Sequence, residues 1–277
     1  MNRIEGRYIS LLTDFGFIRI FGTKPNKDLL INFLNSLFDG FQVIKDVKYL
    51  NSEHVGDVFA ERKPIFDVYC ENEKGEKFIV EMQNASIFPI REQAPKGADW
   101  NFKLDHVYIV ALLNFDLEVE AFDKNDINHD VGLLDKKTHK VFNDKLSFKY
   151  VEIAKFDKTE DELVTLYDKW LYVLKNLSRL DERPAALKEK VFTKLFEEAE
   201  IAKFTPTELK EYEDSLKAYR DIKNSIDTAL EKGREEGRAE SKNLKAIQIA
   251  KKMLAAGMDI DTIINMTDLS KGEIEKL

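Results

Sequence analysis

The sequence has few of the residues that form disulfides in small secreted proteins or that bind structural zinc. Of its 277 residues only one, Cys70, is cysteine, and only four are histidine. A single cysteine excludes an intrachain disulfide, and the apolar neighbours of Cys70 predict a small buried thiol rather than a nucleophile. The histidines show no zinc spacing, and no Walker loop, dinucleotide fingerprint or nucleophile elbow is present.

Long apolar runs and an excess of positive charge are also missing. The longest apolar run, residues 107–113, is too short to cross a bilayer, and no basic apolar leader opens the chain. We therefore expect a cytoplasmic protein with no membrane partner. The net charge of −8 argues against a protein that coats nucleic acid through a broad basic surface. Contact with DNA then requires a local basic patch, a metal ion that neutralises an acidic centre, or a partner.

The first part of the chain carries both helical and strand periodicities. Apolar residues recur at helical spacing over residues 14–21 and 27–38. Strands are predicted at residues 42–50, 64–71, 77–83, 104–115, 131–135 and 146–153, with a polar loop at 125–130. Because residues 104–115 are almost continuously apolar, they predict a central strand buried on both faces. This order predicts an α/β domain with a mixed sheet flanked by helices over residues 1–155.

From there onward the periodicity is helical, which predicts an all-helical C-terminal region. Leucines and aromatic residues at helical spacing predict amphipathic helices over residues 163–177 and 186–199. A long helix is predicted to begin at Thr205 and Pro206, because threonine caps helices well and proline is tolerated in the first turn. We assign residues 156–230 to this helical region.

The last segment, residues 231–277, is predicted to be a charged helical stem followed by a small helical tail. Residues 231–240 are almost wholly polar, which indicates a flexible or solvent-bridging stem. A break at Gly257 and the capping pair Ser270 and Glu273 then predict three short helices, with the order and spacing of a helix-turn-helix. Since the last of these is brief and not notably basic, we favour a packing module that supports a homo-oligomer over a DNA reader.

The predicted hairpin carries two carboxylates that face each other. If its five-residue turn, residues 72–76, pairs Glu71 with Lys77, the same register sets Asp67 opposite Glu81, with Cβ atoms about 5 Å apart. Opposed like charges destabilise a strand pair. A divalent cation with oxygen ligands would neutralise them, and a solvated hairpin face is the alternative.

The two faces of the hairpin differ in character. One carries only apolar side chains, which are expected to be buried: Phe66, Val68, Cys70, Phe78, Val80 and Met82. The other face mixes the two acids with Tyr69, Ile79 and Gln83, so it is neither a clean core nor a clean solvent face. This mixed face is the candidate site.

An Asp on one strand, followed by Glu-x-Lys or Glu-x-Gln on the next, is the core motif of PD-(D/E)xK nucleases. Five ordered blocks extend the likeness: LTDFGFIRIFG at 12–22, KDLLINFLNSLF at 27–38, LNSE at 50–53, IFDVYCENEKGEKFIVEMQ at 65–83 and LDHVYIVALLNF at 104–115. In this order the blocks resemble the PD-(D/E)xK nuclease family transposases, the recombination-promoting nuclease group of bacteria. The resemblance covers most of residues 1–150 and continues more weakly into the tail. It implies a restriction-endonuclease-like fold.

The resemblance also implies a function, the metal-dependent cleavage of DNA. In the mechanism that the resemblance implies, Asp67 and Glu81 would hold Mg²⁺ or Mn²⁺, with the backbone carbonyl of Met82 as a third ligand. Gln83 stands where the wider superfamily commonly has Lys, and its amide would orient a water. Asp14 stands at the family's first acidic position, where it would supply a further ligand, and an ordinary helix N-cap is the alternative role.

Two departures from the family pattern point to a second function. Relatives usually have roughly a dozen more residues, about three helical turns, between Ser86 and Phe88. They also usually have a Lys where this chain has Ile18. Both differences lower the positive charge expected near a DNA phosphate. The alternative is therefore a catalytically weak or inactive nuclease fold that acts as a DNA-binding or protein-interaction factor.

Overall fold

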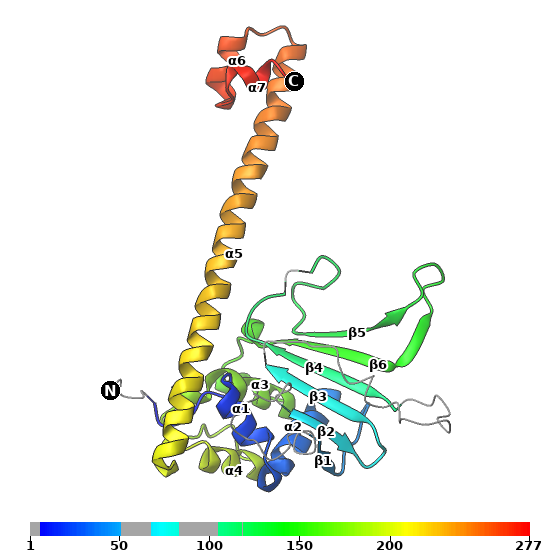
Figure 1. The fold of residues 1–277 in the computed structure, drawn as a ribbon, viewed down its shortest axis with the longest axis vertical. Coiled ribbons are helices and arrows are strands. Elements are labelled where there is room, and N and C mark those ends of the chain that lie inside the picture. The colour runs from blue at the N-terminus through cyan, green and yellow to red at the C-terminus, as the bar shows by residue number, and fades with distance from the viewer. Residues whose placement is uncertain (1–5, 51–67, 83–104, 118) are drawn as a thin grey trace. The chain divides into compact units, whose positions relative to one another are not determined.

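A computed structural model describes residues 6–50, 68–82, 105–117 and 119–277 (Figure 1). The chain forms two compact units, Met1–Tyr219 and Arg220–Leu277. The first unit combines a mixed sheet with helices, and the second is helical, so the predicted α/β fold with a helical C-terminal region is confirmed. Each unit has its own hydrophobic core.

The first unit is built on one six-stranded sheet in the order β1-β2-β3-β4-β6-β5. The strands are β1 (Val47–Tyr49), β2 (Val68–Asn72), β3 (Lys77–Met82), β4 (Val107–Leu113), β5 (Asn128–Leu134) and β6 (Val141–Glu152). Pairing is antiparallel from β1 to β3, parallel from β3 through β4 to β6, and antiparallel between β6 and β5. The two parallel pairs bring the carboxyl ends of three strands to one edge of the sheet.

Helices cover one face of this sheet and form the main core with it (Figure 1). They are α1 (Asp14–Phe21), α2 (Lys27–Phe38), α3 (Leu166–Asn176), α4 (Lys190–Glu198) and the first part of α5 (Pro206–Ala255). Trp170 of α3 lies at the centre, fully buried among aromatic rings, with Nε1 donating to Asn32 Oδ1 at 2.8 Å. The bounds of α1 and α2 are those predicted from the helical spacing.

Strand alternation sends the side chains of the hairpin to two faces, as predicted, and the mixed face also contributes to a hydrophobic core, which the sequence did not predict. Val68, Cys70 and Phe78 belong to the main core, whereas Tyr69 and Ile79 belong to a second cluster on the opposite face. All seven residues of β4 are buried, which confirms the predicted central strand. Burial raises the pKa of the Cys70 thiol to about 12, so this cysteine is an inert core residue.

The predicted turn between β2 and β3 is confirmed. Glu71 pairs with Lys77, and Asn72 and Glu76 close the turn through a hydrogen bond from Asn72 N to Glu76 O at 2.9 Å. Gly75 adopts a φ of +80°, a conformation that glycine reaches without strain.

The strand predicted over 42–50 and the helix predicted over 186–199 are both shorter than the sequence pattern suggested. Residues 42–46 do not extend β1, because the backbone of Ile44 bonds in both directions with the amide of Asn35 at 2.8 Å, away from a strand partner. The helix predicted over 186–199 begins only at Lys190, because Arg183 Nη1 donates to the carbonyl of Leu187 at 2.9 Å and holds a turn there.

Other boundaries also differ from the predictions: β4 spans Val107–Leu113 within the predicted 104–115, and β6 begins at Val141 and not at residue 146. The helix predicted from residue 163 begins at Leu166, where the Thr165 side chain accepts from the N–H of Asp168 at 3.0 Å. The loop predicted over 125–130 ends earlier, since β5 begins at Asn128. The first of the short tail helices is not separate, because α5 continues unbroken to Ala255.

The second unit ends in three helical segments that bury a small core. The end of α5 packs with α6 (Ile260–Thr267) and α7 (Lys271–Ile274) around five buried residues: Ala250, Met253, Ile263, Leu269 and Ile274. Gly257, with φ +77°, ends α5, and Asp259 caps α6. The predicted capping box of Ser270 and Glu273 is present at α7.

Residues 231–240 form part of α5 and are exposed, which confirms a helical and solvated segment. The helix is 50 residues long but rich in charge. Neither α5 nor any other helix in the described part of the chain has the length and apolar character that crossing a membrane requires.

One carboxylate of the first unit, Glu152 at the end of β6, is completely buried and ties separate segments together. Lys155 Nζ lies 2.5 Å and His129 Nε2 lies 2.8 Å from Glu152 Oε2. The N–H of Leu117 donates to Oε1. Burial raises the pKa of the Glu152 carboxyl, but the hydrogen bonds from these three donors outweigh it, so the pKa lies below its ordinary value. The ionised carboxylate thereby fixes the segment after β4 against β5 and β6.

We predict that Glu152→Gln lowers the free energy of unfolding by about 1–3 kcal/mol near neutral pH, because the buried His129 and the N–H of Leu117 lose a charged acceptor while Lys155 is itself only partly buried. The folded pKa lies below the unfolded value of about 4.3, so this contribution is complete above about pH 4.3 and declines as pH falls through the folded pKa. Urea unfolding at several pH values measures the difference.

The exposed Glu213 supplies a matched control, since Glu213→Gln makes the same chemical change without a buried partner. A difference between the wild type and Glu152→Gln that stays constant down to pH 3 would contradict this account of the cluster.

Candidate active site

Strand β3 places the predicted carboxylate Glu81 at the edge of the sheet where the parallel strands end. Glu81 shares a face with Ile79, opposite to the main core, and only 4% of its surface is exposed. Its neighbour on β4 is Ala111, and Tyr150 follows in the same row on β6. A buried carboxylate therefore stands beside the smallest side chain that β4 offers.

Over the residues that the structure describes, β2 pairs with β3 in the predicted register. It runs from the pair Glu71 and Lys77 to the pair Val68 and Val80. Its continuation to Asp67 lies outside the described residues, and so does Gln83.

Met82 is the last residue of β3 and pairs with Leu112 of β4. Its backbone, which carries the carbonyl expected to bind metal, is therefore held in the parallel ladder next to Glu81. The third predicted ligand thus belongs to the same strand end as the buried carboxylate.

Asp14 is the first residue of α1 and is exposed. It is not the N-cap, which is Thr13, whose Oγ1 accepts from the N–H of Gly16 at 3.1 Å. The alternative role predicted for Asp14 is therefore wrong. A carboxylate in the first turn still interacts favourably with the helix dipole.

Helix α5 brings the start of α1 and the end of β4 together. The N–H of Phe15 donates to Ser215 Oγ at 3.0 Å, and Asn114 Nδ2 donates to the hydroxyl of Tyr219 at 2.6 Å. Ser215 and Tyr219 are one helical turn apart and so lie on one face of α5. The segment that carries Asp14 and the strand next to β3 therefore contact the same short stretch of helix.

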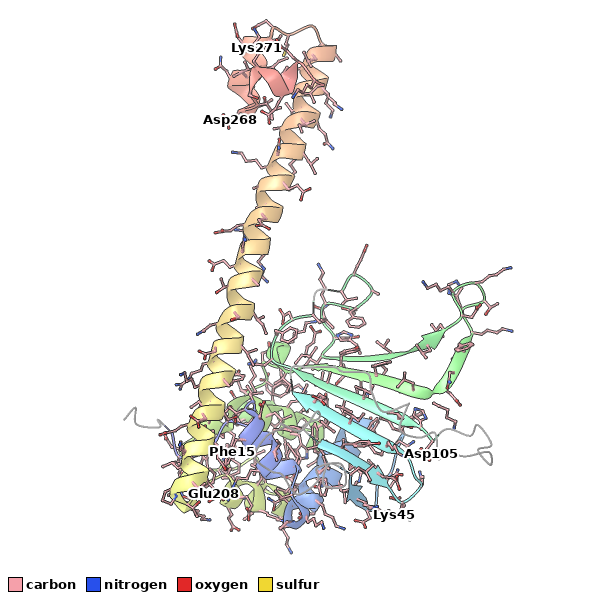
Figure 2. All side chains as sticks on the ribbon, in the orientation of Figure 1. Phe15, Lys45, Asp105, Glu208, Asp268 and Lys271 are labelled. Atoms are coloured by element: carbon pink, nitrogen blue, oxygen red, sulfur yellow. The ribbon has the colours of Figure 1, made fainter. Side chains whose placement is uncertain are left out.

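Aromatic packing holds α1 in that position. The ring of Phe15 lies 5.7 Å from that of Phe204 and 5.9 Å from that of Tyr212, measured between centroids. Figure 2 shows Phe15 above Glu208, near the beginning of α5. The position of Asp14 is therefore set by packing of the residue that follows it.

The donors at this edge fit a hard divalent cation. The carboxylate of Glu81 and the carbonyl of Met82 are oxygen ligands, which Mg²⁺ and Mn²⁺ prefer. Within the ranges that the structure describes, no group of three or more His, Cys, Asp or Glu side chains forms a metal site. The described residues thus supply part of the predicted ligand set.

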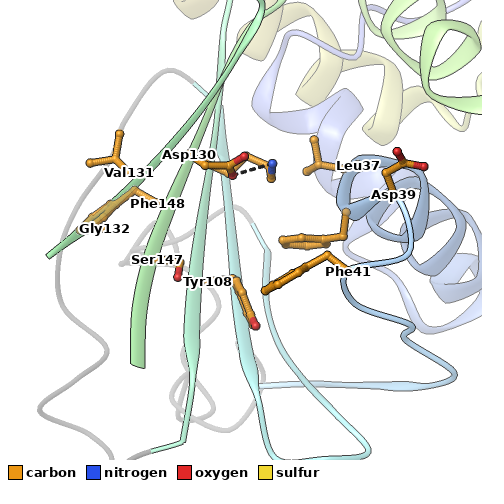
Figure 3. Close-up of a pocket in the computed structure, with 11 residues that line it drawn as sticks. Leu37, Asp39, Phe41, Tyr108, Asp130, Val131, Gly132, Ser147 and Phe148 are labelled. Atoms are coloured by element: carbon orange, nitrogen blue, oxygen red, sulfur yellow. Dashed lines mark ion pairs between the residues drawn. The ribbon is translucent and has the colours of Figure 1, made fainter. Parts of the chain in front are cut away.

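A separate hollow of about 530 Å³ lies elsewhere in the first unit, between the end of α2 and strands β4, β5 and β6 (Figure 3). Phe41 and Tyr108 line it, and Lys149 Nζ pairs with Asp130 Oδ1 at 2.6 Å on its wall. Of the predicted site residues that the structure describes, Asp14, Glu81 and Met82, none lines this hollow. The described part of the candidate site is therefore separate from this hollow.

Sequence reasoning did not identify the contacts that organise this edge. Asn114 had one available signal, since it is the first polar residue after the apolar run of β4. The only signal in the sequence for Tyr219 was its place in the helical spacing of apolar residues. Their hydrogen bond joins residues 105 positions apart, which no local pattern predicts.

Comparison with protein families gives two matches. Residues 11–229 match the PD-(D/E)XK nuclease family transposase model, and residues 243–277 match the Rpn/YhgA-like nuclease family, C-terminal HTH domain. No curated protein and no solved structure matched the chain.

The second match corrects one prediction about the tail. Its helix-turn-helix cadence is confirmed, but a helix-turn-helix domain implies DNA binding, so the preference for a packing module over a DNA-binding one is wrong. A homo-oligomer through the C-terminal helices stays a prediction. The first match spans well over half of the 277 residues, and the chain therefore belongs to the PD-(D/E)XK nuclease family transposases.

Proposed function

We propose that the protein is a metal-dependent DNA endonuclease that hydrolyses phosphodiester bonds. The observation that carries the proposal is the buried carboxylate of Glu81 at the carboxyl edge of parallel strands, in a chain that belongs to a nuclease family. Asp67, Glu81 and the carbonyl of Met82 would hold Mg²⁺ or Mn²⁺.

A bound cation supplies an activated water and stabilises the negative charge that develops on the scissile phosphate. The residues of the chain would hold and orient the reacting groups. Glu81 is fixed by β3, which pairs with a strand on each side. Gln83 would accept a hydrogen bond from the attacking water through its carbonyl and donate one through its amide. Asp14, at the start of α1, would bind the cation directly or through water.

DNA is the partner that both matched regions imply. The second unit would hold the duplex through its helix-turn-helix, while the first unit cleaves it. The short helix α7 and the residues that follow it carry Lys271 and Lys276 but also Glu273 and Glu275, so this end of the chain offers no net positive charge. We therefore expect this module to contribute shape and hydrogen bonds more than electrostatic attraction.

Substitution Glu81→Gln keeps the size of the side chain and removes its charge. We predict that nicking of supercoiled plasmid in Mg²⁺ or Mn²⁺ falls by about 10²–10³-fold, the range found when one group that stabilises transition-state charge is lost. Gel electrophoresis of time points gives the rate.

The control for Glu81 comes from the same hairpin. Glu71 is partly exposed, pairs with Lys77 at the other end of the strands, and should tolerate Glu71→Gln with nicking unchanged. If the wild-type protein binds DNA but nicks it with neither metal, the catalytically inactive DNA-binding factor becomes the better description. If Glu71→Gln and Glu81→Gln behave alike, Glu81 is not a ligand.

A second prediction concerns the helix-turn-helix. Ile263 is fully buried in the small core of the second unit, and Ile263→Ala removes packing worth about 2–5 kcal/mol, enough to unfold so small a module. We expect weaker binding of duplex DNA by fluorescence anisotropy, with Glu81-dependent nicking retained at saturating protein. The exposed Ile249 provides the control Ile249→Ala. Unchanged affinity in Ile263→Ala would show that the module does not hold DNA.

A further inference from the structure

The end of the β5 and β6 hairpin, residues 133–145, extends beyond the rest of the sheet (Figure 1). We call it the ribbon tip. Strand β4 pairs with β6 only from Leu146 onward, so the residues before it have β5 as their neighbour and β4 does not reach them. The ribbon tip is therefore accessible from several sides.

The ribbon tip exposes large apolar side chains. Val141 is 66% and Phe142 77% exposed, and Leu134 is 56% exposed. Phe142 also sits in a β-bulge, because Leu133 pairs with Asn143 and Leu134 pairs with Val141, which leaves Phe142 without a partner in the ladder. Bulges re-aim side chains, and this one presents an aromatic ring to solvent.

Lysines surround these apolar residues. Lys136, Lys137, Lys140 and Lys145 are exposed, and none forms an ion pair with any residue that the structure describes. The same segment has two acids, Asp135 and Asp144. The ribbon tip is therefore positive, although the chain as a whole has a net charge of −8.

The turn that joins the two strands is held in one conformation. Asp135 Oδ1 accepts from both the N–H and the hydroxyl of Thr138 at 2.7 Å, and these hydrogen bonds hold the pKa of Asp135 below its ordinary value. The N–H of Asp135 donates to Lys140 O, and the N–H of His139 to Asp135 O, both at 2.9 Å. One of the two acids is thus used inside the turn, and the lysines are displayed on a fixed frame.

We propose that the ribbon tip binds double-stranded DNA, with its lysines on the phosphates that border a minor groove and Phe142 in contact with the groove. Proteins that bind the minor groove combine cationic side chains with an apolar side chain inserted at the base steps, and the ribbon tip carries both. A second copy of the chain suits the ribbon tip less well, because lysine is depleted in protein interfaces.

The position of the ribbon tip suits the proposed cleavage site. Tyr150 lies in the sheet row of Glu81, eight residues along β6 from Phe142. At about 3.3 Å per residue Phe142 lies at most about 26 Å from Tyr150, toward the amino edge of the sheet, and Glu81 lies two strand spacings, about 10 Å, across the sheet from Tyr150. The two places are therefore about 28 Å apart, less than one helical turn of duplex DNA. This inference rests on the proposed function for its ligand, double-stranded DNA, but it does not require that the protein cleaves the DNA.

The first test replaces Lys136, Lys137 and Lys140 together with Gln. Binding of a labelled duplex of about 30 base pairs, longer than two helical turns, is measured in EDTA by fluorescence anisotropy at several salt concentrations. Each lost phosphate contact should lower the slope of log Kobs against log[salt] by about 0.9, with affinity at least about tenfold weaker near 0.1 M salt. EDTA removes cleavage from the measurement, so an inactive nuclease still gives a result.

A matched control changes the same number of charges elsewhere in the first unit. Lys188, Lys190 and Lys210 are exposed and form no ion pair with a described residue, so their triple substitution by Gln should leave the slope unchanged. Equal effects of the two triple variants would overturn the proposal. Unchanged DNA binding together with a smaller mass by light scattering in the Lys136, Lys137 and Lys140 variant would overturn it in favour of a second copy.

Phe142→Ala separates the apolar contact from the charges. We expect severalfold weaker binding with an unchanged salt slope, since no charge is removed. If Phe142→Ala binds DNA with the affinity of the wild type, Phe142 does not contribute to the interface.

A tethered probe locates the contact directly. Because Cys70 is buried, Thr138→Cys creates the one reactive thiol, and the N–H of residue 138 can still bond Asp135. An iron–EDTA group on this thiol should cut bound duplex DNA, whereas the same group on Lys190→Cys should not. No cutting from position 138 at saturating DNA would contradict the proposal.

Discussion

The parallel pairing of β3 with β4 is the constraint on which the candidate site depends. A parallel pair needs a long connection and strands that are covered on both faces, and β4 is buried along its whole length. That burial fixes the alternation of β3, so that Phe78 and Val80 enter the main core while Ile79 and Glu81 face the other way. A one-residue slip would exchange these faces and bury Glu81 among the aromatic rings of the helical layer.

Side chains from distant parts of the sequence then complete the edge of the sheet. The stretch of α5 that carries Ser215 and Tyr219 bonds both the start of α1 and the residue after β4. The cluster around Glu152 also holds the segment after β4, through the N–H of Leu117. The site is therefore supported by hydrogen bonds between elements, and its geometry depends on the helical region as much as on the sheet.

The sequence predicted the elements whose pattern is local. The helical spacing of Leu29, Leu30 and Phe33 and the alternation around Cys70 each require only neighbouring residues, and both were correct. The short β1 and the late start of α4 depend on bonds from Asn35 and Arg183 to backbone atoms, which no periodicity encodes. For the site, alternation was enough to assign the face of Glu81. The link between α1 and α5 joins residues 200 apart and was not predictable.

The exposed part of α5 has a consequence for how the chain loses its structure. Residues 231–240 bury no side chains, so their amides are protected only by the helix itself, and opening there costs little compared with opening the core around Trp170. The two units have separate cores. Denaturation is therefore not one cooperative transition, and a protease that cuts within residues 231–240 would release a fragment containing the small helical core while the sheet stays intact.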